Sequence, residues 1–277
     1  MKKTFCMLIA GVIASSLFMG SVMAESLGKN DLRFNANGAY LIYSKGKMPY
    51  VDQNHRTLIP LRLVSDLING TITWDQKTKT VDMKAQNFGL IAKLGEKAVT
   101  INGKKMVTDT SLTNNNGTVL VPAKWIADGL GASLKWDAVN NIVSLNDKRF
   151  FQSGHLARMN NESNKDTSFD PGIVPDAISY GKKEGEEQLK IHIKNMTKNT
   201  YTNGQIQDHL LVYISPNHYI EEGTNGDTNS DRSGIRLIDK FEPQKSYEYF
   251  LPVGRLDRKQ LMIDTPQYAF IRYFKYK

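Results

Sequence analysis

The sequence is short of cysteine, because Cys6 is the only one among 277 residues. It lies inside an apolar stretch that runs from about Phe5 to Met19. A lipoprotein anchor needs a cysteine after such a stretch, so this type of membrane attachment is excluded. The rest of the chain can form no disulfide and offers no thiol nucleophile. Its stability must therefore come from hydrophobic cores, which a chain of this size can build.

Long apolar runs are equally scarce. The stretch near the amino terminus is too short to span a bilayer and is broken at Gly11. It follows the basic pair Lys2–Lys3 and ends in the small-residue pattern of 22–24, which is typical of an export signal. We therefore expect residues 1–24 to be a signal peptide. The remaining 253 residues (277 minus 24) would then be secreted, extracellular or envelope-associated, with no transmembrane segment.

Acidic residues are outnumbered by basic ones, and the formal net charge is +8. Removal of residues 1–24 takes away two lysines and no acid, which leaves +6 (8 minus 2). In an exported protein this charge favours cell-wall polymer, another anionic surface polymer, or a protein partner. Solubility alone also explains a charge of this size. Nucleic acid is not expected as a partner of a protein that leaves the cytoplasm.

Two segments of the sequence, 57–84 and 119–146, match each other at a spacing of 62 residues (119 minus 57). Self-similarity of this kind indicates two copies of one supersecondary unit. The matching positions include a proline, a tryptophan and an aspartate in each copy: Pro60, Trp74 and Asp75 in the first, Pro122, Trp136 and Asp137 in the second.

Each copy has the pattern of an amphipathic helix followed by a β-hairpin. The proline has a φ angle that suits a helix start, and apolar residues then recur at helical spacing, as in Leu63, Val64 and Leu67. The tryptophan falls on the inward face of the first strand. The aspartate begins the turn, where its side chain can bond the backbone ahead of it. We therefore assign all six matching residues to folding and expect both tryptophans in the core.

The order of the pieces resembles a known family. Thr-Leu-Ile-Pro-Leu-Arg, a helix, a small-residue stop, Trp-Asp and a hairpin are followed by Leu-Gly, Ile-Asn-Gly and a second such block. This order resembles the copper amine oxidase N-terminal-like (stalk) domain of bacterial secreted proteins, over about residues 32–147. The resemblance implies an α+β domain at 25–147, with an antiparallel sheet wrapped on two helices. It also implies a module without copper and without catalysis.

Amine oxidase activity is not expected in spite of this resemblance. That chemistry needs three histidines on one copper ion, which favours imidazole ligands, and a tyrosine that becomes a quinone. The chain has five histidines, none of them in a His-x-His pair, and no Asn-Tyr-Asp or Asn-Tyr-Glu stretch. We expect no catalytic residue and no cofactor.

The second half has a different pattern. Residues 148–180 are polar and rich in turn formers, which predicts a linker. From about residue 181, apolar residues alternate with polar ones, as in Leu189, Ile191 and Ile193, and no helical pattern appears. We predict an all-β, sandwich-like domain over 181–277. Parts of it loosely resemble the immunoglobulin-like domains that are appended to exported bacterial proteins.

Two groups in this half are candidates for binding. Asp227, Asn229 and Asp231 place oxygen atoms at alternate positions, which suits calcium. The loop lacks the glycine and glutamate that a calcium loop needs, so a solvated loop is the simpler interpretation. The other group is a basic and aromatic strand that could dock on an anionic glycan or a partner, unless it is an ordinary terminal strand: Tyr268, Arg272, Tyr273, Lys275 and Tyr276.

Together these features predict a non-catalytic extracellular or cell-surface module with a structural or binding role. Two alternatives stay open. One is an envelope-acting enzyme or enzyme subunit whose site the motifs do not reveal. The other is a surface module that calcium stabilises.

Overall fold

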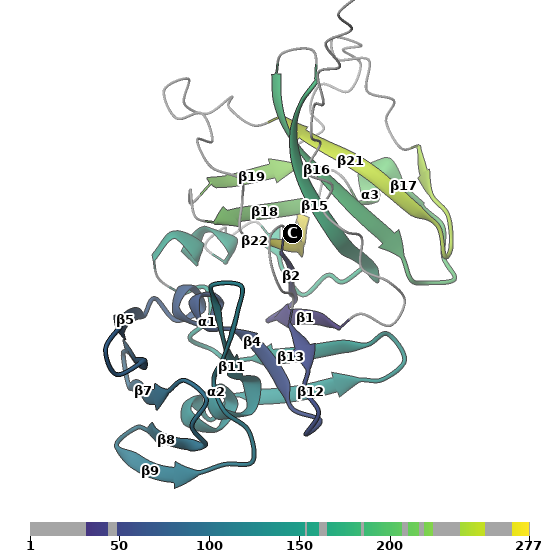
Figure 1. Ribbon diagram of the computed structural model, residues 1–277. Helices are drawn as coiled ribbons and strands as arrows, with labels where there is room; N and C mark the ends of the chain where they lie inside the picture. The colour runs from purple at the N-terminus through teal and green to yellow at the C-terminus, as the bar shows by residue number, and fades with distance from the viewer. Residues whose placement is uncertain are drawn as a thin grey trace, which may run out of the picture.

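The computed structural model describes residues 32–43, 49–152, 154–160, 165–183, 186–206, 210–215, 219–223, 239–252 and 268–276. This part is mixed α and β with strands predominating (Figure 1), so the expected α+β class is confirmed at that level. No helix within it is long and apolar enough to cross a bilayer. The predicted signal peptide, residues 1–24, lies outside the described residues.

The two sequence copies form matching units. Strands β4 (Thr57–Pro60) and β11 (Thr118–Pro122) pair antiparallel and lead directly into helices α1 (Leu61–Leu67) and α2 (Ala123–Leu130). Each helix is followed by a hairpin, β5–β6 (Thr71–Asp75, Thr80–Ala85) in the first copy and β12–β13 (Ser133–Asp137, Ile142–Asn146) in the second. Both prolines stand at the residue before the helix, with φ of −59° and −58°. Proline suits this junction because its φ is preset and the strand end needs no N–H donor there.

The two hairpins join different sheets. The first begins a five-stranded antiparallel sheet with β7 (Phe88–Lys93), β8 (Ala98–Ile101) and β9 (Lys104–Val107) in the order β5-β6-β7-β8-β9. The second joins a seven-stranded sheet in the order β12-β13-β1-β2-β22-β18-β19. In this sheet β1 (Arg33–Ala36) runs parallel to β13, while the other neighbours pair antiparallel. The expected single antiparallel sheet wrapped on two helices is therefore not confirmed, because the strands are divided among several sheets.

The seven-stranded sheet joins distant parts of the sequence. Strand β22 (Tyr268–Tyr273) lies between β2 (Ala39–Tyr43) and β18 (Leu210–Ser215), with β19 (Tyr219–Gly223) beyond. Phe270 is in register with Leu41 on one side and Tyr213 on the other. The regions that the sequence divides at residues 147 and 181 thus share one sheet.

A second sheet covers one face of the first. It consists of β15 (Ile173–Lys183), β16 (Glu186–Asn195) and β21 (Ser246–Pro252). Figure 1 shows these strands on one side of β2 and the two helices on the other. Between the sheets lies a smaller core that includes Ile42, Ile191 and Ile271. The expected β-rich, sandwich-like architecture is present, and β2 from the first half contributes to it.

Short elements complete the described chain. The strands among them are β3 (Tyr50–Val51), β10 (Thr113–Asn115), β14 (Lys165–Asp166), β17 (Tyr201–Thr202), β20 (Lys240–Phe241) and β23 (Lys275–Tyr276). The others are helix α3 (Asn203–Ile206) and a 3₁₀ helix at Gly154–Met159.

Much of the stretch predicted to be a linker packs against the rest of the protein. Phe150, Phe151, Leu156 and Met159 are buried in the larger core, beside residues of α1 and α2. Strand β15 already begins at Ile173. The linker interpretation of 148–180 is wrong for these residues, because four apolar side chains in a polar stretch are enough to fasten it to the core.

Gly129 in α2 shows how tightly this core is packed. A Cβ atom there would lie 2.6 Å from Ile101 Cγ2 and 2.7 Å from Phe88 Cε2. We expect Gly129→Ala to lower the free energy of unfolding by about 1–3 kcal/mol, even though alanine favours a helix by ~1 kcal/mol. Denaturant unfolding measures this.

The matched control is Gly89→Ala, because a Cβ atom at Gly89 meets nothing within 4 Å. This variant should unfold within about 0.5 kcal/mol of the parent protein. Equal effects of the two substitutions would contradict the packing around Gly129.

Candidate functional surfaces

The two tryptophans of the repeat occupy different environments. Trp74 on β5 is partly buried and packs against the larger core. Trp136 on β12 is 50% exposed. The expectation that both lie in the core is therefore wrong for Trp136, whose strand ends the seven-stranded sheet and has no strand neighbour on its outer side among the described elements.

The two aspartates that follow the tryptophans hold the hairpin turns. Asp75 Oδ1 accepts hydrogen bonds from the backbone N–H groups of Lys77 (2.8 Å) and Thr78 (3.1 Å). Asp137 Oδ1 does the same with Val139 (2.9 Å) and Asn140 (3.1 Å). These bonds hold the pKa of both carboxyls below the usual range, led by the N–H of Thr78 for Asp75 and the Asn140 side chain for Asp137. Such turns are structural and leave no pair of carboxylates for acid–base chemistry.

The predicted basic and aromatic surface is not at the surface. Tyr268, Arg272 and Tyr273 are all at least 98% buried. The physical reason is that β22 has a strand on each side and a packed layer on each face, so the predicted exposed edge is wrong for these residues. Lys275 is exposed and lies over the Phe169 ring. The backbone of Tyr276 pairs with β14, and its side chain lies outside the described residues.

Arg272 is a buried cation held mainly by neutral groups. Its guanidinium donates to the carbonyl of Met159 (3.0 Å), to Asn160 Oδ1 and to the carbonyl of Asn37. It also lies 4.6 Å from the ring centre of Phe151. Burial lowers the pKa of Arg272 to about 10. This side chain fastens the β1–β2 turn and the end of the 3₁₀ helix to β22.

Asp66 on α1 is a partly buried ionisable group, and the phenol of Tyr268 donates a hydrogen bond to its carboxylate. Burial raises the pKa of Asp66 to about 6, which nearby Arg62 opposes. The folded protein therefore binds this proton more tightly than the unfolded chain does. The free energy of unfolding should fall as the pH rises from about 4 to about 6.

Asp66→Asn tests this assignment, because the amide keeps an oxygen for Tyr268 and cannot ionise. At about pH 7 the variant should be more stable than the parent by roughly 2–3 kcal/mol, and at about pH 4 the gain should vanish. Urea unfolding at a series of pH values measures both. A difference that does not change with pH would contradict the proton linkage.

A third polar group lies where the two sheets meet. Asp176 is buried at an irregularity in the pairing of β15 with β16, and it contacts Nδ1 of His192. Burial raises the pKa of the Asp176 carboxyl, and its bond to His192 opposes this. Nearby, the buried Tyr40 donates to Asp170 (3.2 Å). These contacts tie β2 to the segment before β15 and join β15 to β16. Among the described residues His192 has no hydroxyl or thiol partner of the kind that a catalytic triad needs.

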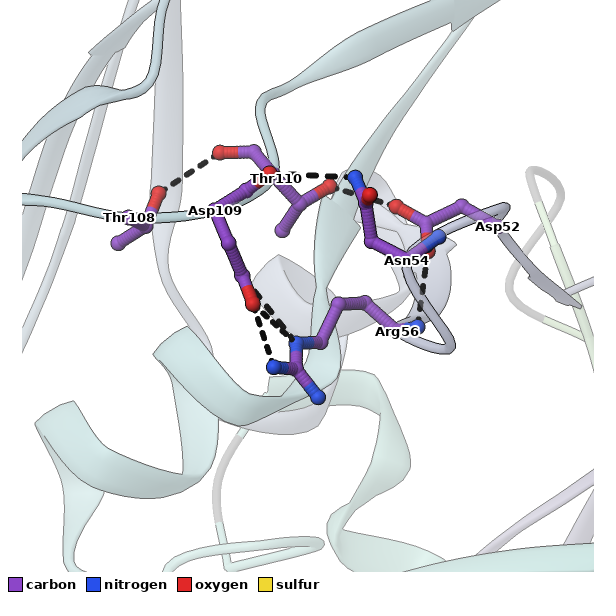
Figure 2. Close-up of polar contacts among 6 residues, drawn as sticks. All are labelled: Asp52, Asn54, Arg56, Thr108, Asp109 and Thr110. Carbon is purple, nitrogen blue, oxygen red and sulfur yellow. Dashed lines mark hydrogen bonds and ion pairs between the residues drawn. The ribbon is translucent and has the colours of Figure 1, made fainter.

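A network of polar residues, most of them exposed or partly exposed, joins the β3–β4 turn to the segment after β9 (Figure 2). Arg56 Nε lies 3.2 and 3.0 Å from the two carboxylate oxygens of Asp109. Asp52 accepts bonds from the backbone of Asn54 and Arg56 and from the hydroxyl of Thr110 (2.7 Å). The carboxylates are occupied by donors within the protein, so the network acts as a surface brace.

Metal ligation finds no support in the described part of the chain, where no group of three His, Cys, Asp or Glu residues could hold an ion. The calcium candidates Asp227, Asn229 and Asp231 lie outside the described residues. The calcium-stabilised alternative therefore stays a prediction.

The five-stranded sheet carries a basic surface that the sequence analysis did not single out. Residues 71–109 contain seven lysines and four acids, a net charge of +3 (7 minus 4). Lys97, Lys104 and Lys105 lie at or beside β9 and are exposed, and none has an ion pair within the described part of the chain. On the outer face Lys105 is in register with Thr100, and Thr100 with the exposed Ile91. The only signal in the sequence was lysine density, which does not show where lysines gather.

Comparison with known proteins gives a match that covers the repeat. No curated protein matches the chain. The family model that does match describes an amino-terminal domain, and no model of a catalytic domain matches with it. The resemblance expected from the sequence is thereby confirmed, because residues 36–145, which hold both copies of the helix-hairpin unit, match the family "Copper amine oxidase N-terminal domain".

Proposed function

We propose that this protein is a non-catalytic module of the cell surface that binds an anionic cell-wall polymer. Its binding surface would be the outer face and β9 edge of the five-stranded sheet, here called the lysine face. The observation that carries the proposal is the group of exposed lysines there, Lys97, Lys104 and Lys105, which have no ion pair with any described residue.

Charge is the first support. Lys84 and Lys93 on the same sheet are neutralised by Asp82 (2.9 Å) and Glu96 (2.6 Å). The three lysines of the lysine face have no such partner among the described residues, so their charge is available to an external anion. Lysine presents a flexible point charge with three donors, which suits irregularly spaced phosphates or carboxylates along a polymer.

The side chains between the lysines are the second support. The outer face offers threonines, which donate and accept hydrogen bonds, next to Ile91 (45% exposed) and Val107 (79% exposed). Hydroxyls with apolar side chains suit a sugar, which presents hydroxyl groups at its edge and C–H groups on its face. The face of a sheet is also accessible along its length, as a linear polymer requires.

The rest of the described chain supports a binding role over a catalytic one. Three ionisable groups inside it, Asp66, Asp176 and Arg272, form hydrogen bonds that join different parts of the protein. The family match adds a domain type that implies a stalk-like module. Secretion and a cell-surface location follow from the predicted signal peptide and are part of the proposal.

Replacement of Lys97, Lys104 and Lys105 by glutamine tests the proposal. Each lysine near an anionic surface contributes about 1 kcal/mol, so retention on purified cell-wall fragments should fall by roughly tenfold or more. Binding of the parent protein should also weaken steeply with salt, since exposed charges are screened within ~10 Å at 0.1 M.

The matched control replaces Lys148, Lys198 and Lys240, which are exposed elsewhere and carry the same total charge. This variant should keep most of the retention. Equal loss in both triple variants would show that net charge alone acts, and unchanged retention in the first would exclude the lysine face.

A further inference from the structure

Strand β12 forms one edge of the seven-stranded sheet and exposes apolar side chains. Leu134 is 37% exposed, Trp136 is 50% exposed, and Val139 in the following turn is 91% exposed. In Figure 1 the β12–β13 hairpin extends beyond the helices, with β12 on its outer side. An edge strand with exposed apolar residues is a template for pairing with another strand.

The two edge strands of the five-stranded sheet carry features that β12 lacks. The equivalent strand of the first repeat, β5, packs Ile72 and Trp74 against the larger core. Strand β9, at the opposite edge of the five-stranded sheet, carries Lys104 and Lys105, and edge lysines discourage pairing. On β12 the matching tryptophan is free to contact another molecule.

The sequence of β12 is complementary to itself. If two copies pair antiparallel with Trp136 opposite Trp136, Lys135 of each copy lies opposite Asp137 of the other. Side chains alternate along a strand, so the two Lys–Asp pairs lie on one face and the indoles on the other. A register centred on Lys135 would instead place two lysines opposite each other, which is unfavourable.

We propose that two copies of this chain associate through their β12 edges, in the register centred on Trp136, and so form a two-fold dimer with a continuous sheet. The charges required are available. Lys135 is exposed and has no ion pair within the described residues. Asp137 accepts three hydrogen bonds in its own turn, and a carboxylate has about four acceptor positions.

The interface is short, so we expect weak association, with a dimer that forms at high protein concentration and dissociates on dilution. Strand β12 pairs with β13 over five residues, but in the register centred on Trp136 only residues 135–137 of the two β12 strands lie opposite each other. Interfaces of small area belong to transient complexes. The inference does not rest on the proposed function, because the lysine face lies on the other sheet. A dimer would present two lysine faces and thereby raise retention on a polymer through multivalency.

Sedimentation of the full chain over a concentration series tests the association. The parent protein should show a monomer–dimer equilibrium. Lys135→Glu would put a second carboxylate opposite Asp137 at both symmetry-related positions of the dimer. Trp136→Thr would remove the pair of indoles. Each substitution should raise the dimer dissociation constant by about tenfold or more. Lys148→Glu makes the same charge change at another exposed position and should leave the constant unchanged.

Cysteine cross-linking tests the register, in a chain that carries Cys6→Ser. Trp136→Cys should form a disulfide-linked dimer on oxidation, because the two residues lie directly opposite across the two-fold axis. Ser133→Cys would lie opposite Val139 and should stay monomeric. Circular dichroism confirms that each variant is folded.

Two results would overturn the proposal. The first is the combination of a parent chain that stays monomeric at every concentration with a Trp136→Cys variant that does not cross-link. It would mean that the β12 edge does not pair with a second copy of this chain. The other is a dimer that Lys135→Glu and Trp136→Thr do not weaken, which would place the contact elsewhere.

Discussion

Removal of residues 268–277 is expected to abolish the cooperative unfolding of the whole protein, including the amino-terminal repeat. Strand β22 lies inside the seven-stranded sheet and pairs with β2 over Tyr268–Arg272. Its loss would expose the edges of β2 and β18 and open both hydrophobic cores. Five of its large side chains are at most 2% exposed: Tyr268, Phe270, Ile271, Arg272 and Tyr273.

The size of the effect follows from burial. A fully buried large apolar side chain contributes roughly 1.5–3 kcal/mol, and a folded domain is stable by only ~5–15 kcal/mol. Loss of four such side chains is therefore comparable to the entire stability. Far-ultraviolet circular dichroism and thermal scans should show no folding transition for the shortened chain.

A shorter deletion is the control for this prediction. Removal of residues 275–277 keeps β22 and eliminates β23, whose two described residues pair only with β14. This variant should retain a cooperative transition. A chain without residues 268–277 that still unfolds cooperatively would show that the repeat is a complete folding unit without β22.

Arg272→Met is expected to lower the free energy of unfolding by about 3–5 kcal/mol, because three acceptors lose their charged donor at once. Methionine has similar length and no charge, so it tests the hydrogen bonds more than the volume. It would leave the carbonyls of Asn37 and Met159 and the amide oxygen of Asn160 without their donor. A buried acceptor without a partner costs about 1–3 kcal/mol.

Arg56→Met is the matched control, because Arg56 also holds an oxygen acceptor but does so at the surface. Its bond to Asp109 joins two side chains that are 43% and 54% exposed, and exposed ion pairs contribute about 0–1 kcal/mol. Chemical denaturation should thus separate the two variants by at least ~2 kcal/mol. Similar values for both would mean that the guanidinium of Arg272 is hydrated, contrary to the structure.

Local features of the fold were predictable because short-range chemistry determines them. A proline followed by apolar residues at helical spacing indicated both helices, and Trp-Asp before a polar stretch indicated both hairpins. The left-handed φ of Gly131 (68°) at the end of α2 fits the glycine there. These signals lie within a few residues of each other, so they do not depend on the partners that the element later finds.

Features that depend on distant partners were not predictable in the same way. Tyr268 and Arg272 have side chains that suit a surface, and the sequence does not show that β2 and β18 lie on either side of them. The consecutive apolar residues Ala269, Phe270 and Ile271 were a usable signal, because a strand buried on both faces has no alternation. The prediction that Trp136 lies in the core was wrong for the opposite reason. Its hairpin matches that of Trp74 in sequence, but no described element packs over its side chain as the core does over Trp74.

The position of β22 also constrains the order of events during synthesis. The repeat is complete in sequence at residue 146, yet the strand that pairs with β2 is made more than a hundred residues later. While a ribosome or a translocation channel releases the chain from its amino terminus, the part that has emerged therefore lacks the strand that pairs with β2 until the last residues appear. Closure of the sheet can follow only when residue 273 has emerged, so the amino-terminal half reaches its final form among the last parts of the molecule.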